Sequence, residues 1–147
     1  MEALSGLLYE SDVFHRNALP DHFDHLDEPA RAEGYVNHLL DEANGVILVA
    51  ELEGVVVGLV QVAVFNERSG PYRRKRPHAV IGDLVVASEH RHAGVGRMLM
   101  AAAHAWAKAR GAAEIELTVW DFNSDATALY KSLGYQTTRR IMSRRLE

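Results

Sequence analysis

The residues best suited to chemistry lie in two short segments of the second half of the chain. The first is a loop with the spacing Arg91-x-x-Gly94-x-Gly96, which follows an apolar, strand-like run and precedes a helical pattern. The start of a helix leaves several backbone N–H groups unpaired and carries a partial positive charge. Glycines let the loop turn tightly and let an anion approach the backbone. The loop therefore predicts a cradle for a phosphate or pyrophosphate; the alternative is a strand-to-helix turn that binds nothing.

The second segment, from Asn123 to Tyr135, has the pattern of a short capped helix. Asn123 or Ser124 suits the N-cap, and Gly134 ends the helix. Tyr130 adds a phenol, which ordinarily titrates at roughly pH 10 and so keeps its proton at neutral pH. Such a group can donate a proton or a hydrogen bond to a reacting atom. The alternatives are a plain helix cap for Asn123 and a core aromatic for Tyr130.

Several other kinds of site are excluded by the residues present. A dinucleotide-binding loop needs a third glycine three residues after Gly96, where this chain has Leu99. A Walker loop needs Gly-Lys-Ser/Thr, which does not occur. The chain has no cysteine, so disulfides, thiolate metal sites and a cysteine nucleophile are excluded. The eight histidines match no common ligand spacing, and no metal is expected.

The elements that must position these segments follow in a clear order. Valine-rich runs on either side of Glu53-Gly54 predict an antiparallel hairpin, and apolar residues alternate with polar ones from 113 to 120. The expected elements are helices at 3–17 and 29–43, strands at 46–52, 55–65 and 78–87, a helix from Val95 to Gly111, a strand at 113–120, a helix from 123 or 124 to about 133, and a last strand or strand pair at 135–146. This order predicts a mixed sheet with helices on both faces.

Composition indicates one soluble domain, residues 1–147. With 48% hydrophobic and 24% charged residues, the chain needs no disulfide or metal scaffold to fold. It has neither a membrane-length apolar run nor a signal peptide, so we expect a cytoplasmic protein without a membrane partner. Acidic residues gather at 10–28 and basic ones at 66–76. Opposite fields near one site would select a charged substrate; the simpler interpretation is two solvated loops.

Together the two segments, about 30 residues apart with one strand between their helices, resemble the GNAT superfamily of N-acetyltransferases. In that family R/Q-x-x-G-x-G/A binds the CoA pyrophosphate, and N-x-x-A-x-x-L-Y-x-x-x-G-F/Y often follows. The second pattern is matched here by Asn123, Ala126, Leu129, Tyr130, Gly134 and Tyr135. The resemblance covers roughly residue 46 to the C-terminus. It implies an α/β (α+β) fold with a mixed, mostly antiparallel central sheet and helices on both faces.

The resemblance also implies direct transfer of an acetyl group from acetyl-CoA to a primary amine in a ternary complex. In the family, the strand that ends at Val86 here diverges from the next one, which ends at Trp120. Main-chain groups in the gap then bind pantetheine and the acyl oxygen. The residues expected to bind the cofactor are Val85, Val86, Arg91, His92, Ala93, Gly94, Val95, Gly96, Arg97, Asn123, Ala126 and Tyr130.

The proton chemistry is assigned less directly. The resemblance makes Tyr130 the general acid for the leaving thiolate; the alternative is a tyrosine that only packs along pantetheine. Some members use a glutamate five residues before the asparagine as general base, but this chain has Thr118 there. Asp83, in an otherwise apolar strand, is the best candidate because burying a carboxylate without purpose is costly; the alternative is pairing with a basic residue. Further candidates are Glu51, Glu116, His78 and an ordered water.

The sequence leaves two alternative functions. The missing glutamate at Thr118 favours a non-catalytic acyl-CoA sensor on the same fold, whereas Tyr130 argues against one. A nucleic-acid-binding role for the basic loop at 72–76 is not expected, because the rest of the chain is acidic and lacks a binding motif. The acidic loop at 19–28 would favour a cationic amine. Family members usually begin with a strand before the first helix, so that strand is either lost here or lies upstream. Dimers are common in the family, and a homodimer is compatible with this chain.

Overall fold

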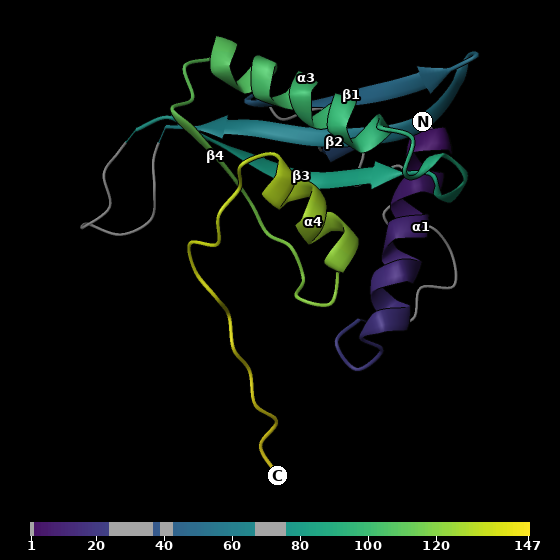
Figure 1. Ribbon diagram of the computed structural model, residues 1–147, viewed down its shortest axis with the longest axis vertical. Coiled ribbons are helices and arrows are strands. Elements are labelled where there is room, and N and C mark those ends of the chain that lie inside the picture. Colours follow the sequence, from purple (N-terminus) through teal and green to yellow (C-terminus); the bar gives the residue numbers. More distant parts are fainter. Residues whose placement is uncertain (1, 24–36, 39–42, 67–75) are drawn as a thin grey trace.

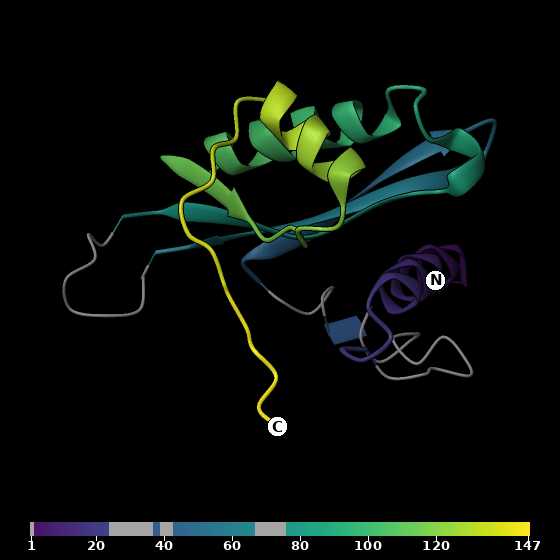
Figure 2. The same ribbon diagram turned by 60° about the horizontal axis from the view of Figure 1, so that its bottom comes forward.

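Helices cover both faces of a central sheet in the computed structural model, which describes residues 2–23, 37–38, 43–66 and 76–147. Helix α1 (Glu2–Ala18) lies against one face, and α3 (Val95–Ala109) and α4 (Ser124–Ser132) lie against the other (Figures 1 and 2). A short 3-10 turn, η1 (Ser88–His90), leads towards α3. The predicted fold class is confirmed. The predicted helix at 29–43 falls largely outside the described residues.

The sheet is mixed, as expected, and mostly antiparallel. Its order is β1 (Gly45–Leu52), β2 (Val55–Phe65), β3 (His78–Val86) and β4 (Glu114–Leu117), with only β3 and β4 parallel. The β3–β4 ladder runs from the pair His78↔Glu114 to the pair Ile81↔Leu117 and then stops. Beyond that point β3 continues as far as Val86 without β4 beside it. The divergence expected from the family resemblance is therefore present.

A β-bulge interrupts β3 where the ladder to β4 ends. Val62 pairs with Ile81 and Val60 with Leu84, so Gly82 and Asp83 together oppose the single residue Gln61. A bulge of this kind bends the strand and changes the direction of a side chain. A Cβ at position 82 would overlap the Gln61 amide, so any larger residue there would force the Gln61 side chain to move.

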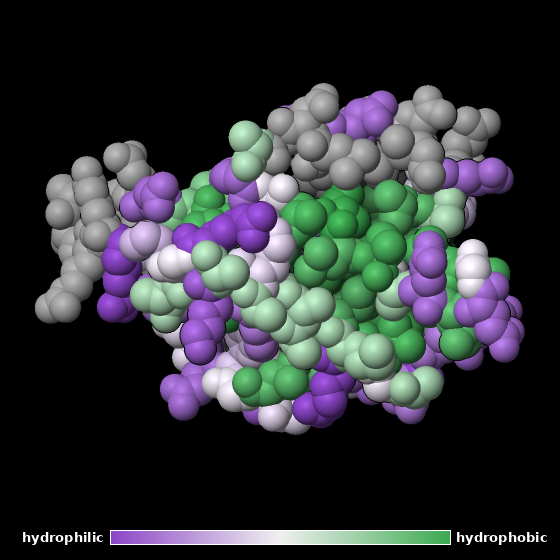
Figure 3. All heavy atoms as spheres, turned by 90° about the horizontal axis from the view of Figure 1, so that it is seen from above, coloured by the Kyte–Doolittle hydropathy of each residue, from purple (hydrophilic) through white to green (hydrophobic). Residues whose placement is uncertain are grey.

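The core has two layers, one on each face of the sheet. Between the sheet and α3 the buried residues are Val60, Val62, Ala79, Ile81, Leu99, Met100, Ala103 and Ala107. On the α1 side they are Leu7, Leu8, Leu59 and Val85. Neighbouring residues of β2 and β3 thus alternate between the two layers, as the pleat of a strand requires. Figure 3, which looks down on the side where β1 lies in Figure 1, shows apolar side chains gathered on that face.

In the last third of the chain, one expected strand is shorter than predicted and another prediction is wrong. The strand predicted at 113–120 is confined to Glu114–Leu117, because residues 118–120 have left β3 and pair with no described strand. The strand predicted at 135–146 does not form. Residues 135–147 are irregular and run away from the rest of the molecule (Figure 1). This segment is rich in arginine, lacks a two-residue apolar alternation and has no strand beside it, so no ladder stabilises it.

Candidate active site

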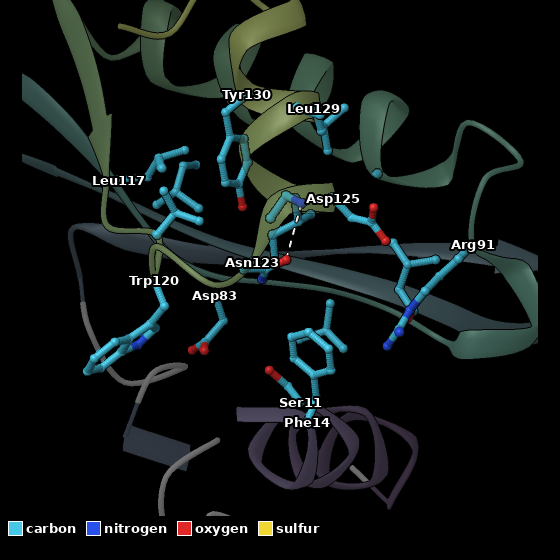
Figure 4. A pocket seen from close by; sticks show the side chains of 18 of the residues that line it. Ser11, Phe14, Asp83, Arg91, Leu117, Trp120, Asn123, Asp125, Leu129 and Tyr130 are labelled. Carbon is cyan, nitrogen blue, oxygen red and sulfur yellow. Dashed lines mark hydrogen bonds between the residues drawn. The ribbon is translucent and has the colours of Figure 1, made fainter. Parts of the chain in front are cut away.

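A cavity of about 910 Å³ opens where β3 and β4 diverge (Figure 4). Residues of α1, the end of β3, the loop before α3, residues 117–120 and α4 line it. All the residues predicted for cofactor binding or catalysis lie in this lining except Ala93. The reserve candidates for the base, Glu51, Glu116 and His78, are not among the lining residues. Thr118 does line the cavity.

The loop before α3 has the backbone shape of an anion-binding turn. Gly94 is the N-cap of α3 with φ 86°, and no side chain caps the helix. His92 also has a positive φ, 62°, which few residues other than glycine adopt. Gly96 serves packing instead, because a Cβ there would lie 3.3 Å from Leu129 of α4. The first N–H groups of α3 therefore have no capping side chain, and the first residues of the helix line the cavity.

The arginine of this loop points away from its glycines. Arg91 donates from Nε to the Val86 carbonyl (3.0 Å) and from Nη2 to Glu10 Oε1 (3.2 Å). The same Glu10 oxygen accepts the Ser88 N–H at 2.9 Å. Arg91 thus joins the end of β3 to α1. Sequence reasoning predicted Arg91 as a cofactor-binding residue but gave no sign of Glu10.

Arg97, one turn into α3, reaches across to α4. Its Nη2 donates to Ser132 Oγ at 2.7 Å, and that hydroxyl donates to the Leu129 carbonyl at 2.6 Å. Arg97 also lines the cavity. Its charge therefore contributes to the positive field at the α3 end of the site.

Asn123 caps α4. Capping is one of the two roles predicted for it, and cofactor binding is the other. Its Oδ1 accepts the Ala126 N–H at 3.2 Å, and its carbonyl accepts the Thr127 N–H at 3.0 Å. Capping uses the oxygen of the side-chain amide, so the amide nitrogen is directed to the cavity (Figure 4). That nitrogen can donate to a ligand without loss of the cap.

Tyr130 projects from α4 into the cavity (Figure 4). Burial raises the pKa of its phenol to about 12, because a buried phenolate loses solvation. Within the described part of the chain, no hydrogen bond reaches its hydroxyl. Its ring packs against Tyr135 with centroids 5.8 Å apart, and the Tyr135 hydroxyl bonds His104 Nε2 at 2.7 Å. Tyr135 therefore holds the ring of Tyr130 in place, while the Tyr130 hydroxyl faces the cavity.

Asp83 reaches the cavity from the β3 bulge. Figure 4 shows its carboxylate on the side of Trp120 and of Ser11 from α1, whereas the Tyr130 hydroxyl comes from the α4 side. The bulge explains this placement, since the extra residue turns the side chain of Asp83 out of the regular alternation. Two groups capable of proton transfer thus approach the gap from opposite sides.

Aromatic rings line the end of the cavity next to α1. Phe14 and His15 come from α1, Phe23 from the residues that follow it, and Trp120 from the end of the diverging segment. Phe23 and Trp120 meet edge to face, with centroids 5.1 Å apart. Side chains of this kind contribute a large apolar contact area to a ligand.

A family model for the acetyltransferase (GNAT) family matches residues 11–135, a span that includes every residue lining the cavity. The chain belongs to the GNAT family. No helix in the described ranges of this GNAT protein is long and apolar enough to cross a membrane.

Similar proteins agree with this membership. The GNAT chain is 32% identical to an N-alpha-acetyltransferase of Sulfurisphaera tokodaii over 110 residues, which are 71% of this chain and 64% of that protein. A mutant of the BH1408 protein from Bacillus halodurans superposes with a TM-score of 0.93 at 25% identity, over 100% of this chain and 94% of the other. AAC(6')-Iy in complex with a bisubstrate analogue, CoA-S-monomethyl-acetylneamine, shares the fold with a TM-score of 0.70 at 20% identity, over 99% and 90% of the two chains. The chain spans 38–68% of the length of the curated relatives it matches.

Sequence reasoning missed the part of the GNAT site that α1 contributes to the lining of the cavity. Ser11, Phe14 and His15 stand at positions i, i+3 and i+4 of a helix and therefore share one face. That spacing was the available signal. Nothing in the sequence indicated which element this face would meet, because the partners Asp83 and Trp120 lie in distant segments.

Proposed function

We propose that this GNAT protein transfers the acetyl group of acetyl-CoA to a primary amine by direct attack in a ternary complex. The observation that carries the proposal is the cavity itself. It places an uncapped helix N-terminus at one end, the unpaired edge of β3 in the middle, and Tyr130 and Asp83 on two sides of the gap.

The residues present suit a CoA thioester. The N–H groups at the start of α3 have no capping side chain, and Gly94, around which a Cβ would meet nothing within 4 Å, leaves the backbone open to the pyrophosphate. The edge of β3 from Gly82 to Val86 has no β4 partner and can bond the amides of pantetheine. The Val86 carbonyl already accepts a hydrogen bond from Arg91. The backbone groups of β3 before Val86 are therefore better placed than this carbonyl to bond the ligand. In the AAC(6')-Iy complex a single analogue joins CoA to an acceptor, which supports simultaneous binding of both substrates.

In the proposed reaction, the lone pair of the amine nitrogen attacks the thioester carbonyl carbon, the C–S bond breaks, and CoA leaves as a thiolate. The amine must lose two protons in all: one before attack, because an ammonium has no lone pair, and one as the amide forms. Asp83, directly or through a water, is positioned to accept a proton from the nitrogen. The chain has no cysteine, so a thioester to the enzyme is not an intermediate.

Tyr130 is proposed to act on the leaving sulfur. With a pKa of about 12, its phenol is a weaker acid than an ordinary thiol, which titrates at roughly 8.5. Complete transfer of the Tyr130 proton to the thiolate is therefore uphill. The phenol instead stabilises the developing negative charge as a hydrogen-bond donor, and the proton that finally neutralises CoA comes from the amine.

The test is release of free thiol from acetyl-CoA by the purified protein with a panel of primary amines, with Tyr130→Phe in parallel. Acceptor-dependent release that falls in the variant supports both the reaction and the role of Tyr130. Binding of acetyl-CoA without release for any amine supports a sensor, which the presence of Thr118 in the cavity favours. Absence of acetyl-CoA binding would overturn the proposal.

A further inference from the structure

The α1 end of the cavity combines exposed aromatic surface with carboxylates. Phe14 and Trp120 line the cavity and remain 41% and 40% exposed. Two carboxylates, Asp12 of α1 and Asp83 of β3, line the same cavity. The surface at this end is therefore suited to a molecule that is both apolar and positively charged.

The aromatic wall is held in place from behind. Phe122, which does not line the cavity, stacks on Trp120 at 6.4 Å and contacts Phe14 at 5.8 Å. His15 lies 5.7 Å from Phe122, and its Nδ1 bonds the Ser11 carbonyl at 2.7 Å. The rings are thus fixed before a ligand arrives, which lowers the cost of ordering them on binding.

Charge is divided along the cavity. Arg91, His92 and Arg97 line the end next to α3, where the helix N-terminus adds a partial positive charge. Asp12 and Asp83 line the part that the aromatic rings enclose. The exception is Asp125, in the first turn of α4, where a carboxylate complements the dipole of its own helix. An anionic and a cationic ligand are thereby directed to different ends.

We propose that the acceptor is an arylalkylamine, a primary ammonium joined by a short chain to a flat aromatic group. This inference rests on the proposed function and specifies its substrate. The ring lies against Phe14 and Trp120, where offset or edge-to-face contacts are favourable. The ammonium is directed to Asp83, beside the point where β3 and β4 part, so the nitrogen is brought to the thioester.

The test measures kcat/KM for phenethylamine, for propylamine, for cyclohexylethylamine, for spermidine and for kanamycin. We expect phenethylamine to exceed propylamine by about a hundredfold and cyclohexylethylamine by a smaller factor, since the flat ring contributes beyond its apolar area. Trp120→Ala and Phe14→Ala should each raise KM for phenethylamine about tenfold while KM for acetyl-CoA stays within about twofold. Phe65→Ala is the matched control, because Phe65 is an exposed aromatic outside the cavity.

Turnover of spermidine or kanamycin in preference to phenethylamine would overturn the inference and leave the proposed function standing. Calorimetric titration of phenethylamine into the protein with acetyl-CoA tests for the case in which the amine binds but is not acetylated. Binding that is lost in Trp120→Ala, without turnover of any amine, would support the aromatic site and count against the reaction. Absence of phenethylamine binding to the native protein would overturn the inference.

Discussion

Glu10 and Arg91 stand 81 residues apart in the chain and form an ion pair of 3.2 Å between α1 and the loop before α3. The pair is more than one-third exposed at both side chains, so its direct contribution to stability is small, about 1 kcal/mol or less. Its importance is positional. Through Ser88 and Val86 it fixes the end of β3, where the cofactor and acceptor regions meet.

Arg91→Lys should weaken acetyl-CoA binding without removing the charge. Lysine cannot donate at once to the Val86 carbonyl and to Glu10 in the geometry of a guanidinium. We expect KM for acetyl-CoA to rise about fivefold and kcat to stay within about twofold. Steady-state kinetics checks this, with Arg110→Lys as control, since Arg110 lies over Trp106 outside the cavity. An unchanged KM would show that the Glu10–Arg91 connection does not position the loop.

Tyr130→Phe should lower kcat by about 10- to 100-fold while KM for acetyl-CoA changes by less than about threefold. The ring and its packing remain, and only the donor to the leaving sulfur is lost. Tyr135→Phe is the matched control, because its hydroxyl bonds His104 and it does not line the cavity. Equal losses of kcat in the two variants would indicate a packing effect and not a catalytic one.

In a plot of kcat against pH, the rate should stay nearly constant on the alkaline side. The protonated phenol is the active form of Tyr130, and its pKa of about 12 keeps it protonated well above the roughly 10 of a free tyrosine. The rate should therefore rise as the amine loses its proton and then hold up to about pH 10, where an unperturbed tyrosine would be half ionised. A decline of kcat centred below that pH, absent in Tyr130→Phe, would contradict the assignment.

Stability should fall steeply at still higher pH. Burial raises the pKa values of Tyr130 and Tyr135 to about 12 in the folded chain, and the charge of Tyr130 adds to the effect at Tyr135. Both contribute stability that is present below the unfolded value of roughly 10 and is lost as pH rises through the folded value. Melting temperatures across this window check the sign, and Tyr135→Phe should flatten the decline.

Gly82→Ala should destabilise the fold by about 1–3 kcal/mol through overpacking, because the added Cβ meets the Gln61 amide. Adding Gln61→Ala should recover part of the loss, since the two residues are in contact and their effects do not add. Denaturant unfolding measures both variants. If the double variant loses the sum of the single effects, the Gln61 side chain is not what excludes a Cβ at this bulge.

The elements that sequence predicted well are those with local signals. Gly94 and Gly96 at a helix start and the cap at Asn123 are recognised from a few neighbouring residues, and the structure has them where they were expected. Asp83 was singled out by its apolar surroundings, and it does reach the cavity. The α3 end of the cavity, where we propose that the pyrophosphate binds, could therefore be outlined from the sequence alone.

What could not be predicted depends on contacts between distant segments. Glu10 meets Arg91, and Phe14 meets Phe122, only because α1 crosses the sheet at one angle. The end of β4 at Leu117 follows from its divergence from β3, although apolar alternation continues to Val119. The absence of a strand at 135–146 has the same origin, because a strand requires a neighbour that sequence pattern does not specify.

The early end of the β3–β4 ladder links the folding of this protein to its ligands. Two lengths of backbone, one from Gly82 to Val86 and one at 118–120, run on without the strand that would normally join them. A molecule whose own amides fill that gap takes the place of the missing ladder. Its binding free energy then adds to the free energy of unfolding, which increases by about 1.4 kcal/mol for each tenfold rise in ligand well above its dissociation constant. For this protein, we therefore expect the melting temperature to rise as the proposed cofactor fills this gap in the sheet.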